Sequence, residues 1–272
     1  MSSIIAVLSD HVANQIAAGE VVQRPASVVK ELLENSIDAG ATKITLQLEG
    51  SGRTLISVTD DGSGMGKEDA ERCFLRHATS KIKNAEDLFN LYTRGFRGEA
   101  MASIAAVSHT LMRTNTAEKG LGLEIKLEGG SIVAKNPYPC AQGTYVEVKN
   151  LFYNVPARRK FLKKDRVELR HCVDEFHRVA LFHTSIEWIM KSDGKTLFHL
   201  KPEPLRRRIN GIFGRKFDER LVPIEEETEA VKVSGFILKP EFAKKKRGEQ
   251  FFFVNNRFIK SPYLHNALRE AF

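Results

Sequence analysis

The chain has 272 residues, of which 42% are hydrophobic, and this is enough for a buried core and roughly two domains. Its 42 Lys and Arg residues exceed its 34 Asp and Glu residues by eight, which favours a polyanionic partner, with nucleic acid ahead of an anionic membrane. Three widely spaced cysteines without a C-x-x-C pair argue against a disulfide framework and a zinc site, and no apolar run approaches the roughly 18 residues of a membrane span.

Residues 25–38 are predicted to form a helix. Pro25 suits its first turn, and its apolar residues recur at helical spacing on one face: Val28, Val29, Leu32, Leu33 and Ile37. At about 100° per residue, Glu31 and Asn35 lie one turn apart at the edge of this face. A polar side chain at such an edge can be half-buried and still reach a ligand.

Two strands are predicted next. Over 44–48, apolar and polar residues alternate, as in a half-buried strand. The second strand ends at Asp60, which shares one face with Ile56 and Val58 because side chains alternate along a strand. A carboxylate at the end of a buried apolar face is costly unless it is paired, so we expect a ligand N–H group to pair with Asp60.

The rest of the chain is predicted to continue with mixed α and β elements. Helices are expected over 67–77, over 84–92, in a small-residue segment that ends near 107, and over 165–182. Strands are expected near 109–115, 121–127, 131–135 and 143–149, followed by a hairpin over 185–200 that turns at Asp193-Gly194.

A linker at 201–204 divides the chain into a predicted ATP-binding domain over 1–202 and a second domain over 203–272. The second domain has a basic helix around 206–208, strands near 230–239 and 250–255, and a final helix with Leu264, Leu268 and Phe272 on one side. This last pattern stops without a cap, so we expect the chain to have been cut from a longer protein.

The polar residues at the ends of these elements predict a site that hydrolyses a nucleotide. A carboxylate with no nearby cation can act as a base, and Glu31 is the candidate that activates water for attack on the γ-phosphate. Asn35 offers an amide oxygen to Mg²⁺, which favours oxygen ligands. Asp60 is expected to accept a hydrogen bond from the adenine amino group, and the Thr144 hydroxyl to complete that contact.

Two glycine-rich loops are expected to lie close to the nucleotide. Gly62 and Gly64 leave room for the base and ribose. The second loop exposes backbone N–H groups in front of a helix N-terminus, which suits phosphate; its residues are Gly95, Phe96, Arg97, Gly98, Glu99 and Ala100. A competing motif, Asp193-Gly194-Lys195-Thr196, is similar to the end of a Walker A loop, but Ile189 stands where a glycine is needed, so we interpret it as a hairpin turn.

Several strings together resemble the MutL family of DNA mismatch-repair proteins. They are Asn14–Val22, Lys30–Ser36, Asp60–Gly64, Arg76–Lys81, Gly95–Ala100 and Leu151–Phe161. The likeness covers nearly the whole chain. Gyrase-type topoisomerases, heat-shock chaperones and sensor histidine kinases share only the sparser nucleotide motifs.

The resemblance implies an α+β fold: an ATPase α/β sandwich, with a mixed sheet and helices on one face, followed by a partial second α/β domain. It implies ATP and Mg²⁺ as ligands, with Glu31 as general base, Asn35 on the metal, Asp60 on adenine, and Thr79 with the 95–100 loop around the nucleotide. Residues 1–20 would be an arm that is ordered by ATP when two copies dimerise. A lysine from beyond the last helix would complete the γ-phosphate site.

The resemblance further implies a clamp that links a MutS-type mismatch recognition protein to a downstream nuclease or helicase. DNA is the expected second ligand, bound without sequence preference and more weakly as salt rises. The candidate contacts are Arg158, Arg159 and Lys160, then Lys244, Lys245 and Lys246, and finally Arg269. We expect such a protein in the cytoplasm with the bacterial nucleoid, or in the nucleus of a eukaryote, and not on a membrane.

Three alternatives remain open at this point. A type II topoisomerase ATPase region would need a cleavage-domain tyrosine further on, and the 14–22 string argues against it. A histidine kinase would need a phospho-accepting helix ahead of motifs that here begin almost at the N-terminus. A nucleotide-binding, DNA-associated scaffold without significant turnover would differ from an ATPase in releasing no phosphate at steady state.

Overall fold

The computed structural model describes residues 7, 10–80, 98–117, 120–229, 231–242 and 248–270. Contacts divide the chain into two compact units, one formed by Met1–Phe176 with Ile186–His199 and the other by His177–Ser185 with Leu200–Phe272. The sequence-based boundary after residue 202 remains a prediction. No helix in the described ranges is long and apolar enough to cross a membrane.

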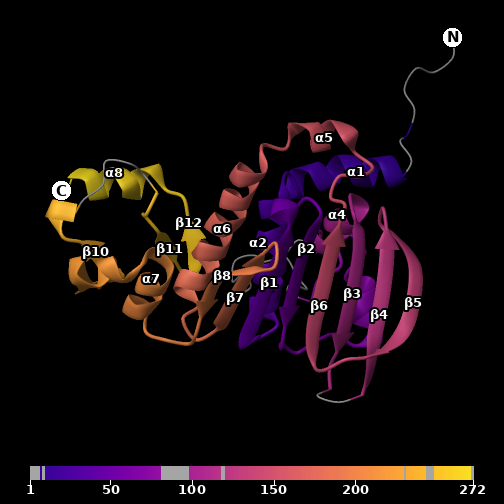
Figure 1. Ribbon diagram of the computed structural model, residues 1–272, viewed down its shortest axis with the longest axis horizontal. Coiled ribbons are helices and arrows are strands. Elements are labelled where there is room, and N and C mark those ends of the chain that lie inside the picture. Colours follow the sequence, from indigo (N-terminus) through magenta and orange to yellow (C-terminus); the bar gives the residue numbers. More distant parts are fainter. Residues whose placement is uncertain are drawn as a thin grey trace, which may run out of the picture. The chain divides into compact units, whose positions relative to one another are not determined.

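The first unit is built on an eight-stranded mixed sheet with the order β5-β4-β3-β6-β2-β1-β7-β8 (Figure 1). Strand β1 pairs antiparallel with β2 and parallel with β7. The strands are β1 (Lys43–Glu49), β2 (Leu55–Asp60), β3 (His109–Asn115), β4 (Leu121–Glu128), β5 (Ser131–Pro139), β6 (Gly143–Lys149), β7 (Glu187–Ser192) and β8 (Lys195–Leu200).

Helices cover one face of this sheet. Ile44, Leu46 and Leu48 of β1 are fully buried, and helix α2 (Pro25–Asp38) contacts β1 and β2. Helix α4 (Ala100–Ala106) contacts β3 and β4. Helix α6 (Asp165–Phe182) places the Phe176 ring 5.8 Å from the ring of Trp188, which lies opposite Ile44 in the parallel register. The predicted mixed sheet with helices on one face is therefore confirmed.

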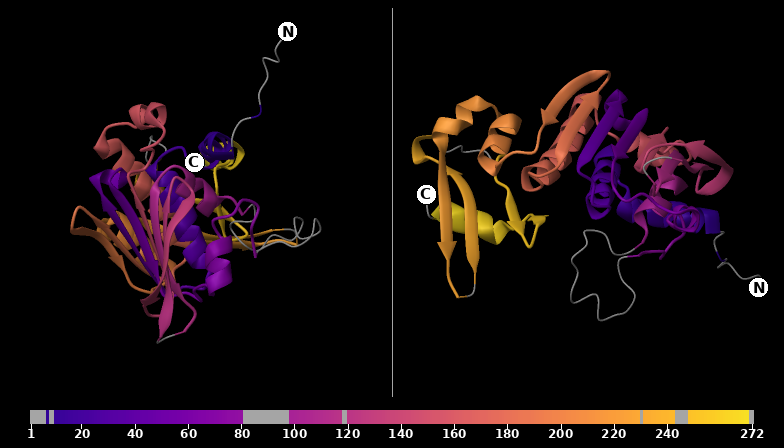
Figure 2. Two further views of the ribbon diagram at one scale, coloured as in Figure 1. Left: turned by 90° about the vertical axis from the view of Figure 1, so that its right-hand side faces the viewer. Right: turned by 90° about the horizontal axis from the view of Figure 1, so that it is seen from below.

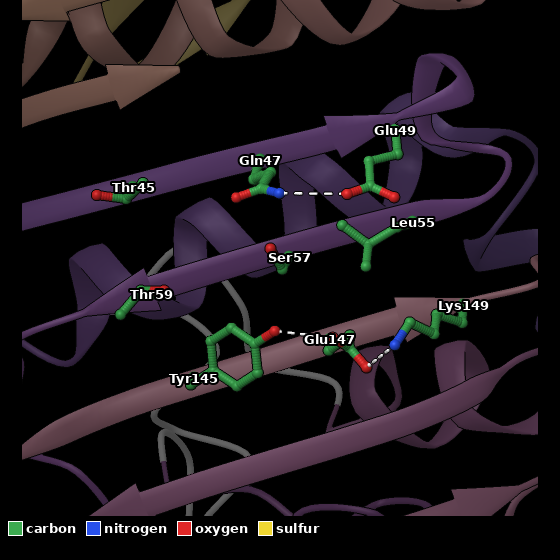
Figure 3. Close-up of a pocket in the computed structure, with 9 residues that line it drawn as sticks. All are labelled: Thr45, Gln47, Glu49, Leu55, Ser57, Thr59, Tyr145, Glu147 and Lys149. Carbon is green, nitrogen blue, oxygen red and sulfur yellow. Dashed lines mark hydrogen bonds and ion pairs between the residues drawn. The ribbon is translucent and has the colours of Figure 1, made fainter. Parts of the chain in front are cut away.

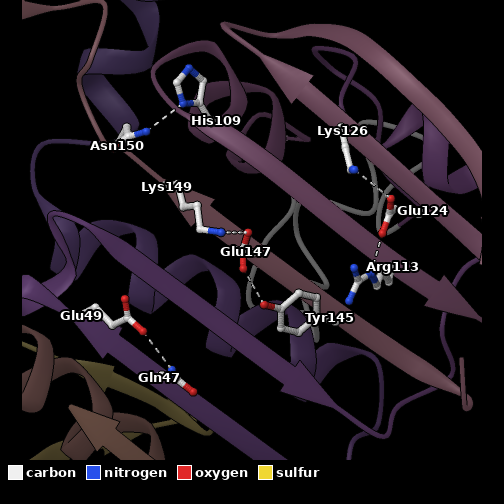
Figure 4. A network of polar contacts seen from close by, with 10 residues as sticks. All are labelled: Gln47, Glu49, His109, Arg113, Glu124, Lys126, Tyr145, Glu147, Lys149 and Asn150. Atoms are coloured by element: carbon white, nitrogen blue, oxygen red, sulfur yellow. Dashed lines mark hydrogen bonds and ion pairs between the residues drawn. The ribbon is translucent and has the colours of Figure 1, made fainter. Parts of the chain in front are cut away.

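The other face of the sheet is polar and carries a hollow of about 370 Å³ over β1, β2 and β6 (Figure 3). Tyr145 donates a hydrogen bond of 2.9 Å to Glu147, which also pairs with Lys149 at 2.7 Å. Burial and the Glu147 carboxylate raise the pKa of Tyr145 to about 12. A second ion-paired group, Arg113 with Glu124 and Lys126, lies on the neighbouring strands (Figure 4). The charged side chains of these two groups therefore pair with one another on this face.

Most predicted elements of the first unit are present. The helix over 25–38, the strands near 109–115 and 143–149, the helix over 165–182 and the hairpin at Asp193-Gly194 are confirmed. Both turn residues have positive φ, 48° and 76°, as a two-residue hairpin turn requires. The Walker-like alternative is thereby excluded by geometry. The expected helix over 84–92 lies outside the described residues.

Three differences have physical causes. Helix α3 (Lys67–Arg72) ends five residues before the predicted end, because the chain turns and reaches His77 with a left-handed φ of 59°. Strand β5 extends past the predicted 135 to Pro139 because it pairs along the whole of β4. Helices α1 (Asp10–Val21) and α5 (Pro156–Phe161) were not predicted, since small residues in one and charges in the other give no apolar stripe.

In its described residues, the second unit contains two small antiparallel strand pairs, helices α7 and α8, and the C-terminal end of α6. Its elements are α7 (Leu205–Phe213), β9 (Leu221–Glu227), β10 (Lys232–Leu238), β11 (Phe252–Val254), β12 (Arg257–Ile259) and α8 (Pro262–Glu270). Figure 2 shows β9 and β10 in orange as a long hairpin. The sequence did not predict β9, because Pro223 and three consecutive glutamates hide its pattern.

Helix α7 was predicted as basic, and one of its arginines is wholly buried. The guanidinium of Arg208 donates to the carbonyl oxygens of Ala180, His183, Thr184 and Lys201 over 2.7–3.3 Å. Its Nε lies 3.7 Å from a carboxylate oxygen of Glu203. Burial lowers the pKa of Arg208 despite this carboxylate. Arg208 thus joins the end of α6 to the 201–204 segment inside the second unit.

Candidate functional site

Helix α2 places the predicted base and the predicted metal ligand on one edge. Its buried face faces the sheet and includes Val28, Val29, Leu32, Leu33 and Ser36. Glu31 and Asn35 are half-buried and one turn apart, as the periodicity predicted. The local geometry therefore holds a carboxylate and an amide where both can reach the same ligand.

A cation lies close to Glu31, whereas the sequence-based interpretation treated Glu31 as a carboxylate with no nearby cation. Lys30 Nζ lies 3.0 Å from Glu31 Oε1 and 3.5 Å from Glu34 Oε2. Burial lowers the pKa of Lys30, but the two carboxylates raise it by more, so the ammonium group stays charged. The Lys30 side chain is 44% exposed, and such pairs contribute at most about 1 kcal/mol, so Glu31 can exchange this partner for another.

Asp60, at the end of β2, accepts hydrogen bonds from three protein donors. The Ser36 hydroxyl donates to Oδ2 at 2.7 Å, and the backbone N–H groups of Gly62 and Thr144 donate to Oδ1 at 3.0 Å and 3.2 Å. Burial raises the pKa of Asp60 by more than these hydrogen bonds lower it. The protein itself therefore supplies much of the pairing that we had expected from a ligand. An ionised carboxylate accepts about four hydrogen bonds, and the described residues supply three of them.

The loop after Asp60 is attached on two sides. The Asp61 carboxylate accepts from the backbone N–H groups of Thr42 and Lys43 at 2.7 Å and 2.8 Å, and from the Thr42 hydroxyl. Burial raises the pKa of Asp61, but these hydrogen bonds lower it by more. At Gly64, φ is +65° and a Cβ would lie 1.9 Å from the carbonyl oxygen of Asn115. Only glycine fits there, because the loop packs directly on the strand β3 backbone.

Thr144 and Asp60 are brought together as predicted, because they are direct partners in the register of β2 and β6. The Thr144 hydroxyl lies 3.2 Å from that of Thr114, which also accepts a hydrogen bond of 2.9 Å from the Met65 backbone. Sequence reasoning missed both Ser36 and Thr114. Ser36 could have been found as a polar residue on the apolar face of α2, whereas Thr114 depends on strand pairing.

The structure describes only the end of the predicted phosphate loop. Gly95, Phe96 and Arg97 lie outside the described residues. Gly98 has a φ of +63°, and a Cβ there would lie 2.5 Å from the carbonyl oxygen of Ala78. Glu99 Oε1 lies 3.4 Å from His77 Nδ1, and Ala100 begins helix α4. The segments that contain Thr79 and Gly98 are therefore neighbours, although they are far apart in sequence.

The predicted DNA contacts differ in their surroundings. Arg159 and Lys160 are exposed on α5, and Arg269 is exposed on α8 of the second unit. Arg158 is half-buried, and its Nη2 donates to the carbonyl oxygen of Ile16 at 3.2 Å. Lys244, Lys245 and Lys246 lie outside the described residues. Within the described ranges, no three His, Cys, Asp or Glu side chains cluster as a metal site.

Family models match both units. Residues 23–147 match a model described as "Histidine kinase-, DNA gyrase B-, and HSP90-like ATPase", and residues 209–272 match one described as "DNA mismatch repair protein, C-terminal domain". The nucleotide loops predicted from the sequence fall within or beside the first match.

Curated relatives and solved structures agree with this assignment. The MutL proteins of Christiangramia forsetii and Parabacteroides distasonis are 59% and 49% identical over the whole chain, which spans 44% of each of them. The ADP complex of the Aquifex aeolicus MutL ATPase domain is 30% identical, with a TM-score of 0.72, and the match covers 93% of this chain and 89% of that one. The N-terminal domain of a DNA repair protein, 24% identical, shares the fold with a TM-score of 0.82, covering 97% and 83%. The chain therefore belongs to the MutL family of DNA mismatch repair proteins and contains an ATPase domain of that family.

Proposed function

We propose that this chain binds ATP through Asp60 and its loop and hydrolyses it with Glu31, as the nucleotide-driven region of a DNA mismatch repair protein. The observation that carries the proposal is the surroundings of Asp60. Three donors among the described residues hold a largely buried carboxylate, which can accept about four hydrogen bonds. The adenine amino group is a donor of the right kind, and it would stabilise the ionised form that burial disfavours.

Glu31 and Asn35 are assigned to the phosphate end of the nucleotide. Glu31 orients water and takes its proton as the water attacks the γ-phosphate, while the bond from the γ-phosphorus to the bridging oxygen breaks and ADP leaves. Asn35 contributes an amide oxygen to Mg²⁺, and this oxygen donor on the same helix edge fits a hard cation that keeps several waters. When it is bound, the metal neutralises charge on the phosphates. We propose that turnover is slow enough for ATP to act as a switch.

The loop around the phosphates is assigned to Thr79 with Gly95, Phe96, Arg97, Gly98, Glu99 and Ala100. The close approach of Gly98 to the Ala78 backbone supports this assignment, because it brings two candidate segments to one place. Backbone N–H groups in such a loop bind phosphate without a side chain.

The matched pair Glu31→Gln and Glu34→Gln tests the proposal. Both carboxylates pair with Lys30, so each substitution removes one of the two ion-pair partners of Lys30, but only Glu31 is assigned to water. We expect Glu31→Gln to keep ATP affinity and to lose at least about 100-fold in phosphate release, the size of a general-base effect, while Glu34→Gln retains it. Equal turnover by Glu31→Gln and the unsubstituted chain would overturn the role of Glu31.

A second candidate function is a nucleotide-binding scaffold without turnover. It is supported by the ion pair that Lys30 makes with Glu31, which holds the candidate base beside a cation. ATP binding by the unsubstituted chain with no phosphate release, with or without DNA, would favour the scaffold.

We further propose that DNA binds to the exposed cations Arg159 and Lys160, with Arg269, Lys244, Lys245 and Lys246 as additional candidates. Removing the Arg159 and Lys160 charges together should reduce the slope of log affinity against log salt by about 1.8, since each phosphate contact contributes about 0.9. Lys195→Ala, at the exposed hairpin turn, is the control and should leave the slope unchanged. An unaltered slope in the double variant would remove α5 from the DNA site.

The complete protein is proposed to form an ATP-dependent homodimer that couples a MutS-type mismatch recognition protein to a downstream nuclease or helicase. Such a protein would act where the DNA is, in the cytoplasm of bacteria such as those that carry the relatives above. Light scattering with and without a non-hydrolysable ATP analogue measures the dimer directly. A mass that stays at that of one chain would count against dimerisation by this region.

A further inference from the structure

Helix α1 contains a glycine, and the space that a side chain at this position would fill is occupied by an arginine from another element. Gly19 lies within α1, and a Cβ at this position would be 1.8 Å from Nη2 and 2.5 Å from Cζ of Arg158. Arg158 belongs to α5, 139 positions later in the chain. The guanidinium group therefore lies directly on the α1 backbone, at a distance that any other residue at position 19 would prevent.

Arg158 also makes a directed contact at this place. Its Nη2 donates to the carbonyl oxygen of Ile16 at 3.2 Å, and a carbonyl has a second lone pair for such a bond besides its helical one. Nη1 of Arg158 is buried and has no hydrogen-bond partner among the described residues. The half-buried guanidinium of Arg158 thus contacts α1 through Nη2, and its Nη1 is shielded from solvent.

Helix α1 in turn supports the two segments that flank the predicted phosphate loop. On one side, Arg76 lies three residues before Thr79. Its Nη2 donates to the carbonyl oxygen of Asn14 on α1 at 3.3 Å. On the other side, α1 packs against α4, which starts directly after Gly98 and Glu99. The two flanks also meet each other through His77 and Glu99 at 3.4 Å.

We propose that Arg158 is a positioning residue for the nucleotide site, which fixes α1 and through it the segments of Thr79 and Gly98, and is not a DNA contact. This inference rests on the proposed nucleotide site. It separates Arg158 from its neighbours Arg159 and Lys160, which are exposed and carry no such contact among the described residues. The basic helix α5 thus has two functions, with one side chain directed at α1 and two directed at solvent.

Gly19→Ala and Arg158→Ala test this relationship from its two sides. The added Cβ meets the far end of a flexible side chain, so Gly19→Ala should displace the guanidinium and leave the fold intact, and alanine favours a helix over glycine. Each single variant should raise the Kd for ATP about tenfold, because each loses one charge-assisted hydrogen bond and such a bond corresponds to about this factor. The double variant should be no weaker than either single one, because both remove the same contact.

Three further measurements make the outcome specific. Arg158→Lys should bind ATP more tightly than Arg158→Ala but less tightly than the unsubstituted chain. Lysine can still donate to the carbonyl oxygen of Ile16, but its compact ammonium group does not reproduce the planar guanidinium. Arg166→Ala, at an exposed arginine of α6, removes the same charge and should leave ATP affinity unchanged. The salt slope of DNA binding should stay the same in Gly19→Ala and Arg158→Ala.

Two results would overturn the inference. One is normal ATP affinity in both Gly19→Ala and Arg158→Ala. The other is additive losses in the double variant together with a smaller salt slope in Arg158→Ala alone, which would assign Arg158 to DNA. The proposed function fails in a different way, namely if the unsubstituted chain does not bind ATP.

Discussion

Ser36 and Asp60 connect the helix layer to the sheet at the predicted adenine site. Ser36 follows Asn35 on α2, and its hydroxyl donates a 2.7 Å hydrogen bond to the carboxylate at the end of β2. This bond holds the metal-ligand candidate and the adenine-binding candidate in one geometry. Both partners are largely buried, so the bond is sheltered from competing water.

Ser36→Ala is expected to weaken ATP binding without abolishing folding. Loss of the hydroxyl removes one of three donors and raises the pKa of Asp60 further, since this hydrogen bond favours the ionised form. We expect about 1 kcal/mol of lost stability and a clear rise in the Kd for ATP, measured by urea unfolding and by titration. Ser57→Ala, in β2 but on the opposite face, is the control and should affect stability alone. Equal Kd values in the two variants would contradict this role.

The pH dependence of stability should change in Asp61→Asn. The folded-state pKa of Asp61 lies below its usual 3.8, so its contribution is present above that value and is lost as pH falls through the folded pKa. The unsubstituted protein should therefore exceed Asp61→Asn in unfolding free energy at neutral pH, and the difference should shrink below pH 3.8. A difference that stays constant down to the lowest pH at which both fold would refute the assignment.

Asp60→Asn should show the opposite sign. The folded-state pKa of Asp60 is raised above 3.8, so its stabilising contribution is complete below 3.8 and is lost as pH rises through the folded pKa. Asp60→Asn should therefore gain stability relative to the unsubstituted protein as pH rises, while ATP affinity falls. Denaturant midpoints at acid and neutral pH measure the first effect. If Asp60→Asn were more stable than the unsubstituted protein only at acid pH, the predicted direction of the pH dependence would be wrong.

Gly64→Ala should be far more harmful than Gly40→Ala. Both glycines have positive φ, +65° and +73°, so both substitutions carry left-handed strain of about 1–2 kcal/mol. Only at Gly64 does the added Cβ meet backbone, at 1.9 Å from Asn115, whereas nothing lies within 4 Å at Gly40. We expect at least about 1 kcal/mol of additional destabilisation at Gly64 and a loss of ATP binding there. Similar unfolding temperatures for the two variants would show that the loop can move away from β3.

Arg208→Met should destabilise the second unit, and Arg207→Ala should not. Removing Arg208 leaves four buried or half-buried carbonyl oxygens without this donor and Glu203 without its cation. Loss of one partner of a buried ion pair typically costs about 3–5 kcal/mol. Arg207 is exposed, so its removal should stay within about 0.5 kcal/mol. Thermal unfolding monitored by circular dichroism compares the two, and equal midpoints would contradict the structural role of Arg208.

Local patterns predicted much of the fold and part of the candidate site. Helix α2 and strands β3 and β6 have the predicted bounds because each has a clear apolar period that one buried face imposes. The turn at Asp193-Gly194 was recognisable because a tight turn needs particular residue types, whereas Gly64 was predicted to leave room for a ligand and its packing against the Asn115 backbone came only from the structure. Helix α5 and strand β9 were missed because their residues do not form such a pattern, and their partners lie far away in the chain.

The sequence by itself determined which residues stand one helical turn apart on α2, which carboxylate ends a buried strand, and to which family the motifs are similar. Only the tertiary structure decided that Lys30 accompanies Glu31, that Ser36 and the Thr144 backbone hold Asp60, and that Arg158 lies on Gly19. The reason is physical: helical and strand periods act over a few residues, whereas the partner of a buried polar group is set by strand register and helix packing between distant segments.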